Sequence, residues 1–165
     1  MFDLKPLSKD AVESALAKAE RYRLLNEPSE AESICLDVLA CDPGNQDALV
    51  TLILAITDQF REDGLPRHVA RAQELLPRLD NEYARTYYGA LIYERRARAH
   101  LSASANALAY AWFVTALREF DRAVAVRPAG NDDAVLRWNA CARSLNRMTA
   151  PATEPQPFDA AIMSE

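Results

Sequence analysis

Three cysteines and two histidines are the side chains best suited to chemistry in this sequence, and their spacing argues against a catalytic or metal site. Cys35, Cys41 and Cys141 follow neither zinc-ligand spacing nor the Cys-x-x-Cys pattern of redox pairs. His68 and His100 belong to no His-Glu-x-x-His helix, and the glycine motifs of phosphate cradles and nucleophile elbows do not occur. The sequence therefore predicts a protein that is not an enzyme and that needs no metal or cofactor.

A basic cluster is the next candidate for chemistry. Arg95, Arg96 and Arg98 are followed by His100 within one expected helix. Guanidinium groups bind phosphate and carboxylate groups, so this cluster could hold phosphate or an acidic partner. Side chains this close in sequence point in different directions around a helix. The alternative is that they pair with carboxylates of neighbouring helices.

Aromatic residues accompany the cluster. Tyr110 and Trp112 lie in the following expected helix, and together with Tyr87 they cannot all face one core, because adjacent positions do not share a helix face. Some of them are therefore expected to form an exposed ridge, as a partner site or the seam of a homodimer. With Arg95, Arg96 and Arg98, Tyr110 and Trp112 define a possible second binding surface.

Composition favours one all-α domain. The chain has 165 residues, is 50% hydrophobic and contains only 4 Gly, a balance typical of close-packed helices. Its net charge of −5 disfavours nucleic-acid binding. No apolar run is long enough for a signal peptide or a membrane span, so the sequence predicts a cytoplasmic protein without membrane insertion.

Apolar spacing and proline positions predict the helices. The expected ranges are 8–25, 28–41, 45–60, 67–76, 81–101, 105–126 and a last helix within 131–147. Short turns require neighbouring helices to lie antiparallel. The long apolar run in 48–56 predicts that the third helix is the most interior one. Residues 149–165 contain Pro151, Pro155 and Pro157 with little periodicity, and are expected to form a flexible C-terminal tail.

The chain contains an internal repeat. One spacing relates two stretches: Ala31-x3-Cys35-x2-Val38-x4-Pro43 and Ala116-x3-Phe120-x2-Ala123-x4-Pro128. The second stretch resembles the B-helix signature of the tetratricopeptide repeat family, and Tyr22 and the pair Tyr88-Gly89 stand at A-helix positions of that family. The resemblance implies an α-solenoid of about three antiparallel helix pairs plus a C-terminal capping helix, in one domain over 1–148. Its units would cover about 12–45, 46–81 and 82–130, followed by the capping helix at 131–147.

The same resemblance implies a concave groove lined by the first helix of each pair. Its residues, carried over by repeat position, are Leu16, Glu20 and Arg23 in the first unit, Val50, Leu54 and Asp58 in the second, and Thr86, Ala90, Tyr93 and Glu94 in the third. This set is apolar with acidic edges. An apolar protein segment or peptide flanked by Lys or Arg would suit such a groove, because opposite charges set register and speed association.

Three functions remain open at this stage. The first is an adaptor or scaffold that binds a peptide or helix of a partner protein in the groove. The second is a chaperone of the bacterial secretion type, suggested only by resemblance in length, charge and repeat type. The third is a structural subunit that self-associates through its two longest helices.

Overall fold

The computed structural model describes residues 2–61, 64–148 and 150, and the regular structure in this part of the chain is helical throughout, without a strand. The helices are α1 (Val12–Leu24), α2 (Pro28–Cys41), α3 (Gln46–Asp58), α4 (Leu65–Leu75), α5 (Glu82–Ser102), α6 (Asn106–Ala125) and α7 (Asp133–Leu145). Two short 3-10 helices, Lys9–Ala11 and Leu76–Arg78, precede α1 and follow α4. The predicted all-α class is confirmed. Of the predicted tail, only Ala150 belongs to the described residues; positions 149 and 151–165 lie outside them.

Side-chain caps mark the starts of α3 and α5. The side-chain carbonyl of Asn45 accepts a hydrogen bond from the Ala48 N–H at 2.9 Å, which caps α3. Asn81 caps α5 in the same way, accepting from the Ala84 N–H at 2.7 Å. The first helix begins later than its expected range of 8–25. Ser8 makes no side-chain capping bond and precedes the 3-10 helix, so α1 begins only at Val12.

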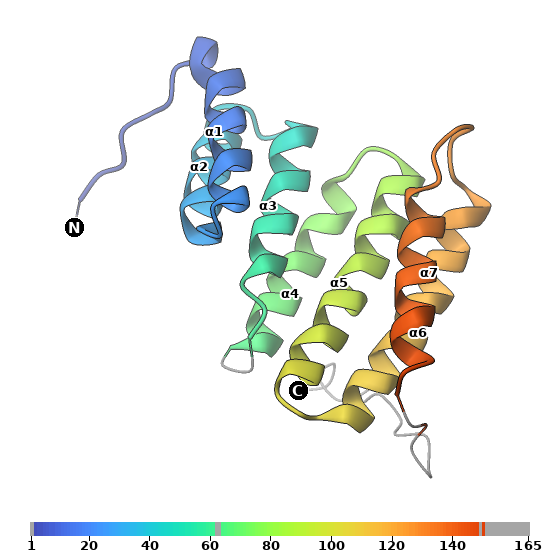
Figure 1. Ribbon diagram of the computed structural model, residues 1–165. Helices are drawn as coiled ribbons and strands as arrows, with labels where there is room; N and C mark the ends of the chain where they lie inside the picture. The colour runs from blue at the N-terminus through green and yellow to red at the C-terminus, as the bar shows by residue number, and fades with distance from the viewer. Residues whose placement is uncertain (1, 62–63, 149, 151–165) are drawn as a thin grey trace, which may run out of the picture.

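Consecutive helices pack against each other as antiparallel neighbours along the chain (Figure 1). In addition, α1 contacts α3, α3 contacts α5 and α5 contacts α7. These four helices run in the same direction and lie nearer the viewer in Figure 1, with α2, α4 and α6 behind them. We call the side formed by α1, α3, α5 and α7 the odd-helix side, and the opposite one the even-helix side.

Buried apolar side chains form two clusters that meet at α5. The first lies mainly among α1 to α4 and is centred on α3, eight of whose 13 residues are buried, which confirms the predicted interior position of that helix. The second lies among α5, α6 and α7 and contains the fully buried rings of Phe113 and Phe120. Ile92 of α5 belongs to the first cluster, whereas Leu91 belongs to the second. Helix α5 is therefore packed on both flanks.

Among the helices within residues 2–61, 64–148 and 150, none combines the length and the apolarity that crossing a bilayer requires.

Candidate functional site

The cysteines are placed as packing residues. Cys35 and Cys141 are fully buried, and burial is the main cause that raises the pKa of each thiol from 9.0 to about 12. A thiol with so high a pKa is a poor nucleophile at neutral pH. In the described part of the chain, no group of three or more His, Cys, Asp or Glu side chains is arranged to hold a metal ion.

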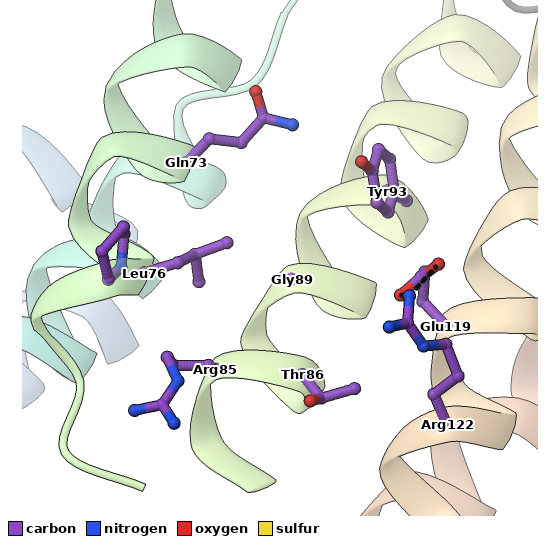
Figure 2. A pocket seen from close by; sticks show the side chains of 9 residues that line it. Gln73, Leu76, Arg85, Thr86, Gly89, Tyr93, Glu119 and Arg122 are labelled. Atoms are coloured by element: carbon purple, nitrogen blue, oxygen red, sulfur yellow. Dashed lines mark hydrogen bonds and ion pairs between the residues drawn. The ribbon is translucent and has the colours of Figure 1, made fainter. Parts of the chain in front are cut away.

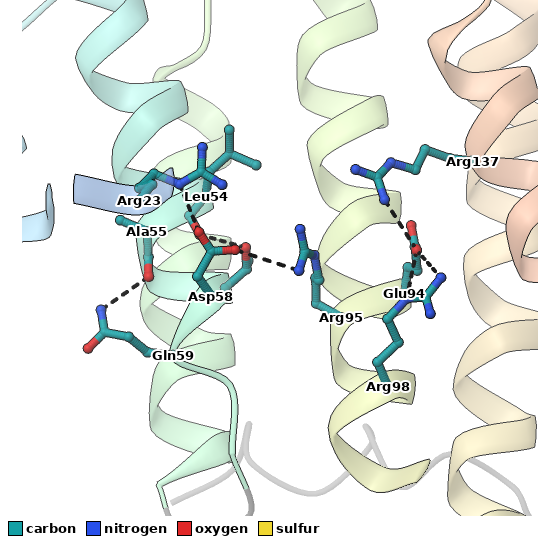
Figure 3. A network of polar contacts seen from close by, with 10 residues as sticks. Arg23, Leu54, Ala55, Asp58, Gln59, Glu94, Arg95, Arg98 and Arg137 are labelled. Atoms are coloured by element: carbon teal, nitrogen blue, oxygen red, sulfur yellow. Dashed lines mark hydrogen bonds and ion pairs between the residues drawn. The ribbon is translucent and has the colours of Figure 1, made fainter. Parts of the chain in front are cut away.

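An ion-pair chain joins three helices of the odd-helix side (Figure 3). The Arg23 Nε of α1 donates a hydrogen bond to Asp58 Oδ2 of α3 at 2.8 Å. On the other side of that carboxylate, Arg95 Nη1 of α5 lies 3.6 Å from Asp58 Oδ1. Asp58 therefore ties α1, α3 and α5 together.

A second group of charges continues the row from α5 to α7. Glu94 is fully buried, and its Oε1 accepts hydrogen bonds from Arg98 Nε at 2.9 Å and Arg98 Nη2 at 2.8 Å. Arg137 Nη1 of α7 lies 3.5 Å from the same oxygen. The Tyr87 phenol lies close to the same guanidinium group. Although burial acts to lower the pKa of Arg137, the Glu94 carboxylate and this phenol raise it above its ordinary value.

The predicted groove residues of α1 and α3 differ in position and exposure. Arg23, Leu54 and Asp58 lie together on the odd-helix side, where Figure 3 shows Leu54 beside the Arg23–Asp58 pair. Glu20 is exposed, while Leu16 and Val50 are half-buried against the first core cluster. Arg23 and Asp58 are bound to each other, so each offers a partner less charge than an isolated side chain would.

The predicted groove residues of α5 need correction. Ala90 and Glu94 are fully buried and are not part of an exposed groove. Thr86 and Tyr93 line a pocket between α4, α5 and α6, not the odd-helix side. The reason is that α5 is packed on both flanks, so its rotation is set by the two cores and not by its repeat position. Arg95 takes the place on the odd-helix side that the sequence assigned to these residues.

The pocket that Thr86 and Tyr93 line has a volume of about 380 Å³ (Figure 2). Gln73 and Leu76 form one wall, and Glu119 and Arg122 of α6 form the other. Gly89 lies at its floor, where an added Cβ would meet Leu76 Cδ1 at 3.5 Å, an ordinary contact. The Glu119 carboxylate accepts a hydrogen bond from Arg122 at 3.1 Å. This pocket is the alternative to the odd-helix side as a binding site.

The possible second surface is not one surface. Arg95 pairs with Asp58, Arg98 with Glu94, and the guanidinium carbon of Arg96 lies 3.7 Å from the ring centre of Trp112. Pairing with neighbouring helices, the alternative left open for Arg95, is thus what the structure shows. Trp112 is 3% exposed and stacks on Tyr93 with ring centres 5.7 Å apart. The expected aromatic ridge is absent there, because α5 and α6 bury this tryptophan between them.

The two tyrosines of the expected aromatic ridge are not fully exposed. Tyr110 and Tyr87 are both half-buried. The rings of Tyr87 and Tyr88 make an edge-to-face contact with their centres 5.1 Å apart. Sequence reasoning missed Tyr87 and Arg137 as polar partners on the odd-helix side. The only signal for Arg137 was its position beside the apolar stripe of the last helix.

Comparison with known proteins found no matching family model, no similar curated protein and no similar solved structure.

Proposed function

We propose that the protein is a non-catalytic interaction module that binds a peptide or a helix of a partner protein on the odd-helix side. The observation that carries this proposal is the row of four parallel helices, α1, α3, α5 and α7, which contact one another in sequence. Such a row offers one elongated side to a ligand, with an apolar position at Leu54 and charged side chains around it. Mixed apolar and charged surfaces of this kind suit protein recognition, in which apolar anchors supply affinity and charges set register.

We infer further that the helices form a tetratricopeptide-like solenoid of about three pairs, with α7 as the cap. The support comes from the internal repeat. Ala31, Cys35 and Val38 of α2 are fully buried, and so are their counterparts Ala116, Phe120 and Ala123 of α6. Equivalent positions of two helices therefore have equivalent burial, as stacked repeats require. The odd-numbered helices would then line the concave side.

Experiments can distinguish the two alternative roles from this proposal. A chaperone of a secreted client would copurify with an otherwise insoluble protein in stoichiometric amount. Self-association through α5 and α6 loses its main support, because Trp112 is buried and cannot seat a second copy.

A peptide-library selection against the immobilised protein tests the proposed function. Selected peptides are then measured on the Leu54→Arg variant and on the control Leu36→Arg. Leu36 is a leucine of α2 that is 49% exposed, so the control makes the same chemical change away from the odd-helix side. We expect Leu54→Arg to abolish binding and Leu36→Arg to leave it near wild type, with helicity of both variants verified by circular dichroism. Selection of no peptide, or equal affinity for Leu54→Arg and wild type, would reject the proposal.

A further inference from the structure

The odd-helix side gathers positive charge in a chain whose net charge is −5. We call this group the arginine cluster; its members are Arg23, Arg95, Arg98 and Arg137, with the carboxylates Asp58 and Glu94 among them. Four guanidinium groups against two carboxylates leave a formal excess of two positive charges. This local excess is opposite in sign to the whole chain.

The four arginines lie at unequal distances from the two carboxylates. Arg23 donates to Asp58 at 2.8 Å, and Arg98 donates to Glu94 from Nε at 2.9 Å and from Nη2 at 2.8 Å. Arg95 and Arg137 reach the same carboxylates only at 3.6 and 3.5 Å. Arg95 Nε is buried and finds no hydrogen-bond partner among the described residues. Arg95 and Arg137 are therefore held less closely by these carboxylates than Arg23 and Arg98 are.

These two arginines also repel each other. Burial lowers the pKa of Arg95 below its ordinary value; the Asp58 carboxylate opposes this shift, and the Arg137 guanidinium adds to it. Their side chains are 29% and 37% exposed, so both remain accessible from solvent. They come from neighbouring helices, α5 and α7, on the side seen in Figure 3. A carboxylate placed between them would bind two guanidinium groups and relieve their repulsion.

We propose that the segment bound on the odd-helix side is acidic, and that one of its carboxylates binds between Arg95 and Arg137. This inference rests on the proposed function and specifies the partner. It departs from the expectation of a partner with Lys or Arg flanks, which depended on Glu20, Asp58 and Glu94. Glu94 is buried and Asp58 is bound to Arg23, so only Glu20 of the three is an exposed acid.

Fluorescence anisotropy with three labelled peptides tests the inference. The peptides have equal length and the same leucine positions, and they carry Glu, Gln or Lys at the remaining positions. We expect the Glu peptide to bind most tightly and to weaken as salt is raised, because exposed charges are screened. Arg95→Gln and Arg137→Gln should each weaken its binding by about tenfold, the effect of losing one charge-assisted contact.

Two further variants make the result specific. Arg95→Lys, which keeps the charge, should retain most of the affinity. Arg122→Gln removes an arginine of the even-helix side that is 72% exposed, and should leave binding unchanged. The helicity of all variants is compared by circular dichroism. If one of the variants Arg95→Gln and Arg137→Gln unfolds, the other one is used for the binding measurement.

The outcomes separate this inference from the proposed function. If the Lys or Gln peptide binds more tightly than the Glu peptide, and Leu54→Arg abolishes that binding, the acidic partner is refuted while binding on the odd-helix side stands. If the Glu peptide binds equally to wild type, Arg95→Gln and Arg137→Gln, the site between these arginines is refuted. If none of the three peptides binds, the inference fails, and the library selection decides the proposed function independently.

Discussion

Glu94 offers the sharpest test of the packing on the odd-helix side, because it is a fully buried carboxylate whose partners are partly exposed. The Arg98 and Arg137 side chains are 43% and 37% exposed. Replacing Glu94 with Gln removes the buried charge and lets both guanidinium groups hydrate. Replacing both arginines with Gln leaves the carboxylate buried without a cation, which costs more than the net value of the ion pair.

The magnitudes follow from this asymmetry. We expect Glu94→Gln to lower the free energy of unfolding by about 1–2 kcal/mol, the scale of lost hydrogen bonds to a charged group. The double variant Arg98→Gln/Arg137→Gln should lose about 3–5 kcal/mol, as an uncompensated buried charge does. Adding Glu94→Gln to the double variant should restore about 2 kcal/mol, because it removes that charge.

Urea unfolding followed by circular dichroism measures these free energies. The pair of the half-buried Glu119 and the exposed Arg122 supplies the control, and Arg122→Gln should change stability by less than about 1 kcal/mol. The reasoning is refuted if Glu94→Gln is more destabilising than the double arginine variant, or if the triple variant is no more stable than the double one. Either result would mean that Glu94 is hydrated in solution.

Three further predictions concern the cores and the thiols. At neutral pH, Cys41, which is half-buried, should react with a thiol reagent in the native protein, whereas Cys35 and Cys141 should react only after unfolding; rapid reaction of all three would contradict their placement. Because the folded-state pKa of each buried thiol is raised from 9.0 to about 12, its protonated form is favoured by folding, so stability is fully present below pH 9 and is lost as pH rises toward 12. The free energy of unfolding should fall by about 1.4 kcal/mol per pH unit for each such thiol in that window, and urea titrations that show no fall for wild type relative to Cys35→Ala/Cys141→Ala would contradict this. Phe120→Ala should lower the free energy of unfolding by about 3–5 kcal/mol, because the ring is fully buried and its loss leaves a cavity; a loss below about 1 kcal/mol in urea unfolding would show that the second cluster is loosely packed.

Helix positions could be predicted from the sequence because their signals are local. Asn45 caps α3 through a bond to a residue three positions away, and Pro28 stands in the first turn of α2. Errors arose where a boundary depends on more than one signal. The fourth helix begins at Leu65, two residues before the predicted start, and Pro77 lies in a 3-10 helix that follows α4.

The rotation of α5 could not be predicted, because it depends on contacts from distant parts of the chain. Glu94 and Arg98 are four residues apart, a spacing that indicates a helical ion pair. The third member of this group, Arg137, is 43 residues from Glu94 and carries no signal that links the two. Repeat position therefore assigned Ala90 and Glu94 to a groove, whereas packing against α6 and α7 buries both.

The use of the odd-helix side for binding is the central claim, and arginine side-chain NMR tests it most directly. The Nε–H signals of Arg23, Arg95 and Arg137 report on the odd-helix side, and that of Arg122 reports on the even-helix pocket. Titration with a library-selected peptide should shift the first three signals and leave the Arg122 signal unchanged. A shift confined to Arg122, with the other three signals unmoved, would contradict the account and assign binding to the pocket between α4, α5 and α6.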